Sequence, residues 1–385
     1  MTYTFVRGVA AALALLALTG PAHAAEPRDP WVRAWGANGS GQLGNGSVLM
    51  QQTPSDVRDL ARADVRELAA GGGADSSSFA VAVLNDGTVR TWGANTEGQL
   101  GNGTTDNRPF PAAVAGPSGV SDVAAGVHSA YAVRGGRVLA WGGNAYGQLG
   151  DGSTTAATRP VAVQSLSKVT DIAAGCYHAL ALREDGTVWA WGRNNHGQLG
   201  LGTSADRNTP QRVPGLTAVV EVASGCNHSL VRTADGTVKA WGYNTNGQLG
   251  NDSVDGSAAP VDVLHLADVA RIFAAGYHSF AVLDGGEVRA WGWNGRGQLG
   301  DGTTVSRTTP VPVPGLTDVT SLAGGYAHTV ASLTDGSVLA WGENSVSQLG
   351  DGTTADSPTP VTALPPGSGL RQVAASVVAR SSYAY

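Results

Sequence analysis

Short runs of alternating apolar and polar residues, separated by Gly, Pro and Asp, recur along most of the chain. The segment from Val169 to Ala218 is representative. Its pattern predicts four short strands, at residues 171–174, 178–182, 187–191 and 211–213. An Asp-Gly turn precedes the third strand, and Pro210 precedes the fourth. Four strands within 50 residues indicate a small antiparallel sheet.

The same unit is repeated along the chain at intervals of about 50 residues. A Trp-Gly pair marks each copy, at Trp35, Trp92, Trp141, Trp191, Trp241, Trp291 and Trp341. A four-stranded unit buries little apolar surface alone, so such units stack, and they usually close radially. The pattern therefore predicts an all-β fold, a seven-bladed β-propeller with four-stranded blades.

The two ends of the repeat array are complementary halves of one unit. The array opens inside a repeat at residues 31–36 and stops inside one at residues 381–385. We expect these N- and C-terminal strands to pair in a composite blade, which closes the ring and removes an open sheet edge. Residues 25–385 then form one propeller domain.

Residues 1–24 have the features of a signal peptide. A short segment ending in Arg7 precedes an apolar run from Gly8 to Leu18, and an Ala-x-Ala site follows at Ala22–Ala24. The apolar run is shorter than the roughly 20 residues that a spanning helix needs. We expect a secreted, periplasmic or cell-envelope protein with no membrane span after cleavage.

Composition narrows the classes of partner. The chain has 55 Gly and only 14% charged residues, which suits short strands and tight turns. Its net charge is -6 and it has no Lys/Arg run, so the electrostatic footprint of a nucleic-acid binder is missing. We predict no nucleic-acid partner and no cofactor, and we expect a monomer.

Two stretches, residues 172–182 ("IAAGCYHALAL") and 185–200 ("DGTVWAWGRNNHGQLG"), resemble the regulator of chromosome condensation repeat. The resemblance covers nearly the whole mature chain and implies a seven-bladed propeller used as a binding platform, without implying one activity. In the chromosomal member of that family, nucleotide exchange on a small GTPase depends on inserted wedge residues, and a basic tail serves chromatin. The even spacing from Trp141 to Trp341 leaves no room for a sizeable wedge.

Positions shared by the repeats are interpreted as structural. The Asn of Trp-Gly-x-Asn suits Asx-type turns, and in Gly-Gln-Leu-Gly the Leu can enter the core while the Gln bonds backbone between blades. The repeat His is expected to bond backbone at a strand start, and we assign it to His128, His178, His228, His278 and His328. We predict no metal site, because His residues on separate blades do not converge, and no catalytic site.

The last Trp-Gly copy has Ser347 where the others have Gly, and only Glu343, Ser345 and Val346 in it are left free for a partner.

Cys176 and Cys226 occupy the same position in adjacent repeats. Export permits a disulfide between them, but a bridge needs Cα atoms about 6 Å apart. Neighbouring blades come that close only near the ring axis. The sequence leaves the pairing open.

Positions that vary between the repeats are the candidates for partner recognition. The variable residue of Trp-Gly-x-Asn is Arg193, Tyr243 and Trp293 in three consecutive repeats, and these types are enriched in binding hot spots. The same loops carry Tyr146, His196 and Arg296. An alternative is that these long side chains merely cover surface between blades.

The sequence as a whole predicts a non-catalytic secreted scaffold that binds an unknown protein or glycan. The candidate partner face consists of Tyr146, Arg193, His196, Tyr243, Trp293 and Arg296. The alternative function is that of a guanine-nucleotide-exchange-like regulator of a small GTPase, as the family resemblance suggests.

Overall fold

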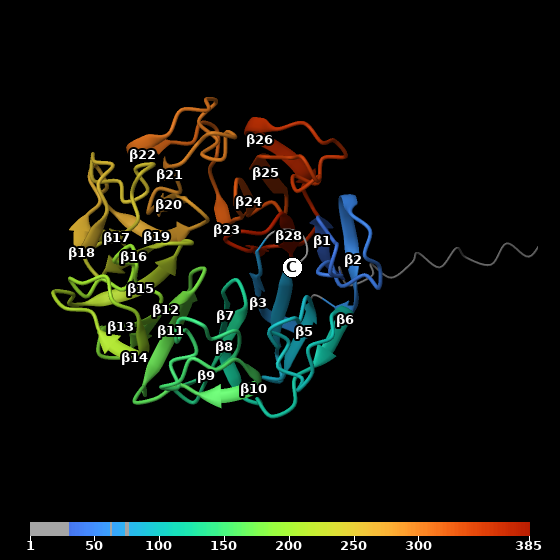
Figure 1. The fold of residues 1–385 in the computed structure, drawn as a ribbon. Helices are drawn as coiled ribbons and strands as arrows, with labels where there is room; N and C mark the ends of the chain where they lie inside the picture. Colours follow the sequence, from blue (N-terminus) through green and yellow to red (C-terminus); the bar gives the residue numbers. More distant parts are fainter. Residues whose placement is uncertain (1–30, 62–63, 74–76) are drawn as a thin grey trace, which may run out of the picture.

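The computed structural model describes residues 31–61, 64–73 and 77–385, and within these ranges the chain is all-β. The strands form seven four-stranded antiparallel sheets arranged as blades around a central axis, as predicted (Figure 1). The predicted signal peptide lies outside the described residues. In the part of the chain that the structure describes, no helix is long and apolar enough to cross a membrane.

Each blade runs from an inner strand beside the axis to an outer strand at the perimeter. Blade 1 contains β3 (Val65–Gly71), β4 (Phe79–Leu84), β5 (Val89–Gly93) and β6 (Arg108–Ala113). Blade 2 contains β7 (Val120–Ala125), β8 (Ser129–Arg134), β9 (Arg137–Gly142) and β10 (Ala157–Ala162). Blade 3 contains β11 (Val169–Ala174), β12 (His178–Arg183), β13 (Val188–Gly192) and β14 (Arg207–Arg212). Blade 4 contains β15 (Val219–Ser224), β16 (His228–Thr233), β17 (Val238–Gly242) and β18 (Ser257–Asp262).

The remaining blades follow the same order. Blade 5 contains β19 (Val269–Ala274), β20 (His278–Leu283), β21 (Val288–Gly292) and β22 (Arg307–Pro312). Blade 6 contains β23 (Val319–Gly324), β24 (His328–Leu333), β25 (Val338–Gly342) and β26 (Ser357–Leu364). Blade 7 is composite, and its strands are β27 (Val373–Ala375), β28 (Ser381–Ala384), β1 (Trp31–Gly36) and β2 (Gln51–Ala61).

The predicted closure of the ring is present in blade 7. Its strand order is β2-β1-β28-β27, so the first described strand pairs with the last, and the blue and red ends of the chain meet in Figure 1. In the antiparallel register Ala34 lies opposite Tyr383, and Trp35 lies opposite Ser382. The composite blade therefore leaves no gap in the ring.

The fourth strand of each blade is longer than the sequence pattern predicts. In blade 3 the pattern placed it at residues 211–213, whereas β14 begins at Arg207, before Pro210. The outer strand pairs on one side only, so a residue without an N–H is tolerated there. A register shift between Ala190 and Gly192 accommodates the extra residues. The strand residues at this exposed edge are mostly polar, so the apolar pattern did not reveal where the strand begins.

The core lies between blades rather than at the centre of the ring. One apolar cluster joins blades 2 and 3 and contains Tyr131, Leu149, Ile172 and Trp191. Equivalent clusters occupy the other six interfaces between neighbouring blades. All seven Trp of the Trp-Gly pairs are fully buried in them. The blades are thus held by contacts with their neighbours, as stacked repeats require.

Candidate functional site at the channel mouth

Two loops of every blade meet at one end of the channel. In blade 3, residues 175–177 connect β11 to β12, and the loop that begins at Arg193 follows β13. Antiparallel pairing puts both loops at the same edge of the sheet, and the Arg193 N–H donates to the Tyr177 carbonyl oxygen over 2.9 Å. Gly192 has φ of 99°, and a Cβ there would lie 2.4 Å from the Tyr177 oxygen. Only Gly allows the two loops to approach so closely.

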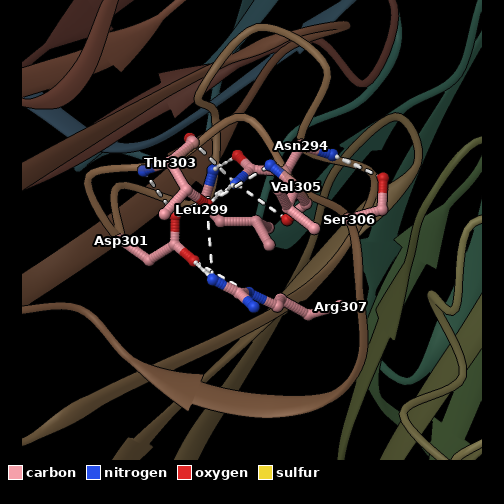
Figure 2. Close-up of polar contacts among 7 residues, drawn as sticks. All are labelled: Asn294, Leu299, Asp301, Thr303, Val305, Ser306 and Arg307. Atoms are coloured by element: carbon pink, nitrogen blue, oxygen red, sulfur yellow. Dashed lines mark hydrogen bonds and ion pairs between the residues drawn. The ribbon is translucent and has the colours of Figure 1, made fainter.

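The long loop after the third strand is fixed by its repeated Asn. In blade 5 the Asn294 Oδ1 atom accepts from the Leu299 N–H over 2.9 Å, while Nδ2 donates to the Thr303 and Val305 carbonyl oxygens over 3.0 and 3.1 Å (Figure 2). Asp301 also accepts from Asn294 Nδ2 and forms an ion pair with Arg307 (Figure 2). The side chains around Asn294 therefore project from a rigid support.

The repeated Gln and Trp form the joint between neighbouring blades. Each Trp indole N–H donates to the backbone carbonyl oxygen of the Gln in the preceding blade, over 2.7–2.9 Å at all seven interfaces. The Gln side chain also bonds within its own loop, as where Gln198 Oε1 accepts from the His196 N–H. The Trp, Asn and Leu of the repeat thus have the structural use that the sequence predicted. The Gln differs from the prediction, because its side chain bonds within its own loop and only its backbone carbonyl bonds across to the next blade.

Four of the repeat His residues lie in the same joint. His178, His228, His278 and His328 are buried, and each Nε2 contacts a Ser or Thr hydroxyl of the next blade at 2.9–3.0 Å. In the blade 3 pair, Ser229 donates its only hydroxyl proton to the Gln198 carbonyl oxygen, so it accepts from His178. The partner is therefore a side chain rather than the backbone that we expected. Burial lowers the pKa of these imidazoles to about 3, which keeps them neutral.

His128 does not occupy the repeat His position, and this sequence assignment was wrong. Ser129 lies opposite Gly142, just as His178 lies opposite Gly192. His128 is therefore the counterpart of Tyr177, one residue earlier. Its ring lies at the channel mouth, with its centroid 6.4 Å from that of Tyr177. Both are half-buried.

Aromatic side chains and one arginine from blades 2 to 6 form an arc of two clusters on the rim of the channel. We define this aromatic arc as Tyr146, Tyr177, Arg193, His196, Tyr243, Tyr277, Trp293 and Tyr326. At one end, Tyr146 and Tyr177 are in edge contact at 5.2 Å, and the Arg193 guanidinium lies 4.7 and 5.7 Å from their centroids. The candidate residues Tyr146 and Arg193 therefore form one cluster with Tyr177, whereas the candidate His196 contacts Tyr243 instead.

The other half of the arc surrounds a hollow. His196 lies against Tyr243 with their centroids 4.9 Å apart, and Tyr243 contacts Tyr277 at 5.9 Å. Trp293 and Tyr326 complete the group at 5.4 Å. The hollow has a volume of about 170 Å³, and its lining residues are Tyr243, Asn246, Tyr277, Trp293 and Tyr326. No charged side chain belongs to this lining.

Sequence reasoning missed three tyrosines of the arc. Tyr177, Tyr277 and Tyr326 lie on the short loop between the first and second strands, and each is half-buried. Tyr177 and Tyr277 directly precede the repeat His, whereas Tyr326 lies two residues before His328. The predicted antiparallel pairing of the second and third strands could have identified them. This pairing places the start of the second strand, and the loop before it, beside the Trp-Gly-x-Asn loop.

Two residues expected to be free for a partner have partners within the chain. Arg296 is exposed and pairs with Asp356, with 3.3 Å between Nη1 and Oδ2. Glu343 is only 5% exposed and pairs with Arg380 at 3.2 Å, so its expected availability was wrong. In blades 7 and 1 the corresponding positions are the buried Ala37 and Ala94. The arc therefore covers one side of the rim only.

Cys176 and Cys226 are joined in a disulfide at the inner side of the mouth. Their Cα atoms are 4.5 Å apart, and each residue lies two positions after the end of an inner strand. Their backbones are also joined, since the Cys176 N–H donates to the Cys226 carbonyl oxygen over 3.1 Å. The disulfide links blade 3, which carries Arg193 and His196, covalently to blade 4, which carries Tyr243.

The fold and the repeated Trp–Gln joint define a seven-bladed propeller of about 50-residue units. Residues 20–266 match the RCC1-like domain model, and the regulator of chromosome condensation (RCC1) repeat model matches residues 285–332 and 335–377. The chain belongs to the RCC1-like family.

Individual relatives show the fold more than the function. Alsin of Rattus norvegicus is 40% identical over 96 residues, and the ultraviolet-B receptor UVR8 of Arabidopsis thaliana is 33% identical over 104 residues. These segments cover 25% and 26% of this chain, but only 6% of alsin and 22% of UVR8. Human WBSCR16 has a TM-score of 0.78 at 24% identity, covering 92% of this chain and 98% of that one. Prp20p of Saccharomyces cerevisiae has a TM-score of 0.80 at 23% identity, covering 93% and 92%.

Proposed function

We propose that this protein is an exported, non-catalytic propeller whose aromatic arc binds a partner protein. The observation that carries the proposal is the separation of roles within each repeat. The shared Trp, Asn, Gln and Leu are buried in the joints, whereas the arc places varied Tyr, Trp and Arg side chains on a rigid rim. Residues 1–24 would direct export and would be removed from the mature protein.

The chemistry of the arc supports protein binding. Tyr, Trp and Arg are enriched in binding hot spots, and Tyr and Trp supply a large contact area at a low cost in conformational entropy. The half-buried rings of Tyr243, Tyr277 and Trp293 already contact one another. Little ordering is therefore needed when a partner binds.

Affinity capture with a double variant tests the proposal. The wild-type protein, immobilised and incubated with native culture medium or envelope extract, should retain a partner. The variant carrying Tyr243→Ala and Trp293→Ala should lose it with an unchanged melting temperature. A matched control is Phe110→Ala, which removes a 45% exposed ring from the outer strand β6. The control should retain the partner.

Three results would count against this proposal. A large loss of stability in the double variant would make the two rings structural. Undiminished capture by a folded double variant would remove the arc from the interface. Loss of capture after periodate oxidation of the extract would indicate a glycan in place of a protein.

The alternative function is nucleotide exchange on a small GTPase. Its support is family membership, since the similar structure of Prp20p was studied with its binding to Gsp1p and histones. The inner strands of blades 3 to 6 begin at Val169, Val219, Val269 and Val319, so no wedge-sized insertion interrupts these repeats. Accelerated release of labelled GDP from a small GTPase would favour this alternative.

A further inference from the structure

Arg193 has no acidic partner within the described residues. Its guanidinium lies against the rings of both Tyr146 and Tyr177, 4.7 and 5.7 Å from their centroids. In the part of the chain that the structure describes, no carboxylate lies within ion-pair distance and no hydrogen bond is made by the guanidinium. Arg193 is half-buried. Its N–H groups are therefore available to a ligand.

Other arginines on the same rim are already paired. Arg296 pairs with Asp356 at 3.3 Å, and Arg380 pairs with Glu343 at 3.2 Å. A guanidinium stacked on aromatic rings keeps its planar fork in a fixed orientation and can bind a carboxylate through two parallel hydrogen bonds. The position of Arg193 thus favours a carboxylate ligand.

The hollow lies beside the loop that carries Arg193. His196 of the same loop lies against Tyr243, a wall of the hollow, with their centroids 4.9 Å apart. The lining is aromatic, with Asn246 as its only non-aromatic member. A ligand that places its carboxylate on Arg193 can therefore place a neutral group in the hollow.

We propose that the aromatic arc recognises a peptide segment in which an Asp or Glu lies within a few residues of a large apolar side chain. The carboxylate binds the Arg193 guanidinium, and the apolar side chain enters the hollow between Tyr243, Tyr277 and Trp293. The volume of about 170 Å³ gives room for one such side chain. This inference rests on the proposed function, which assigns a protein partner to the arc.

Selection from a phage-displayed random peptide library tests the inference. Peptides selected on the immobilised wild-type protein should be enriched in Asp or Glu near Phe, Tyr, Trp or Leu. Labelled synthetic copies are then titrated by fluorescence polarisation. Arg193→Gln should weaken their binding about 10- to 100-fold, as expected for loss of a hydrogen-bonded charge pair. Binding should also weaken at high salt.

Arg296→Gln is the matched control, because it removes a rim arginine that is already paired with Asp356. It should change the affinity less than twofold. Unchanged binding to Arg193→Gln, selected peptides without acidic residues, or failure to select any peptide would overturn the inference.

The double variant Tyr243→Ala with Trp293→Ala separates this inference from the proposed function. Peptides that the double variant loses but Arg193→Gln retains would overturn the carboxylate assignment alone. Peptides bound equally by all variants would contradict both.

Discussion

The backbone carbonyl of the repeated Gln accepts the hydrogen bonds that join each blade to the next. At four joints it accepts two, one from the Trp indole and one from a Ser or Thr hydroxyl, as where Trp241 and Ser229 both donate to Gln198. At the other three joints the hydroxyl position is occupied by Ala80, Ala130 or Ala179, which have no proton to donate. The Gln42 and Gln148 carbonyl oxygens, at the joints with Ala80 and Ala179, still receive a second bond.

A tyrosine of the preceding blade replaces the missing hydroxyl. The Tyr131 hydroxyl donates to the Gln148 carbonyl oxygen over 2.8 Å, and the Tyr383 hydroxyl donates to that of Gln42 over 2.6 Å. Both rings are fully buried. The Gln carbonyl oxygen thus keeps two bonds at these joints, although the second bond comes from the blade that carries the Gln and does not cross to the next blade.

Removing one tyrosine hydroxyl tests the contribution of the second bond. Tyr131→Phe should lower the free energy of unfolding by about 1 kcal/mol, the usual net value of a buried hydrogen bond. Adding Ala179→Ser, which restores the donor found in the other blades, should recover part of that loss. Urea denaturation of the three proteins provides the measurement. An undiminished stability of Tyr131→Phe would show that the second bond contributes nothing.

Among the elements, the inner strands carry acidic side chains that face neighbouring strands. The Asp122 carboxylate accepts from the Ile172 N–H of the next blade over 3.0 Å, and Asp171 accepts from Val222 in the same way. Burial raises the pKa of Glu67 to about 7 and that of Asp122 to about 9, and the negative charge of Glu67 adds to the rise at Asp122. These two carboxyls therefore retain protons near neutral pH, where ordinary carboxyls are ionised.

This pairing predicts stability that falls as the pH rises. The folded chain holds the protons of Glu67 and Asp122 more tightly than the unfolded chain, whose carboxyls ionise near pH 4. The stabilisation is complete below about pH 4 and is lost as the pH rises through the folded pKa values of about 7 and 9. Melting curves of Asp122→Asn should show a weaker decline than wild type over this range.

Asp284→Asn is the control for this experiment, because Asp284 is an exposed acid in a hairpin turn. It should leave the pH dependence as in wild type. An equal decline in wild type and Asp122→Asn would show that the pair does not hold its proton in the folded state.

The sequence was informative about strands and less informative about loops. Periodicity identified the inner three strands because one face of each is buried against the next blade. It shortened the outer strand, whose edge is polar and contains Pro210. The sequence also assigned His128 to the repeat His position, one residue too early. The motif alone does not show which residue pairs with which across the sheet, and the structure places Ser129 opposite Gly142. The residues of the channel mouth could be predicted only in part. Tyr177 and Arg193 lie on different loops, and only the folded sheet brings them together.

At the scale of the whole molecule, stability depends on the seam in blade 7. The Tyr385 hydroxyl accepts from the Leu68 N–H over 3.1 Å, and the Tyr383 ring packs against Trp92. Hydrogen bonds also link successive blades around the mouth, and Ser376 closes this belt by donating to the Gly72 carbonyl oxygen over 2.9 Å. The C-terminal segment therefore fastens blade 7 to blade 1.

Deleting residues 379–385 should destabilise the protein strongly. Loss of a buried aromatic side chain such as Tyr383 costs about 3–5 kcal/mol, and the deletion also removes β28 from between β1 and β27. We expect a loss of more than about 5 kcal/mol and a sharply lower melting temperature by calorimetry. An unchanged melting temperature would mean that the seam does not support the ring.

Because the ring closes on itself, the number of repeats is fixed by geometry. Seven equal blades are turned by about 51° from one to the next, and six or eight would need a different angle at every Trp–Gln joint. An open array can gain or lose one unit at a cost confined to its neighbours. Here single residues on the rim are free to vary between repeats, but duplication or loss of a whole 50-residue unit would disturb all seven joints at once. Change in this protein is therefore expected to occur by substitution within repeats rather than by change in their number.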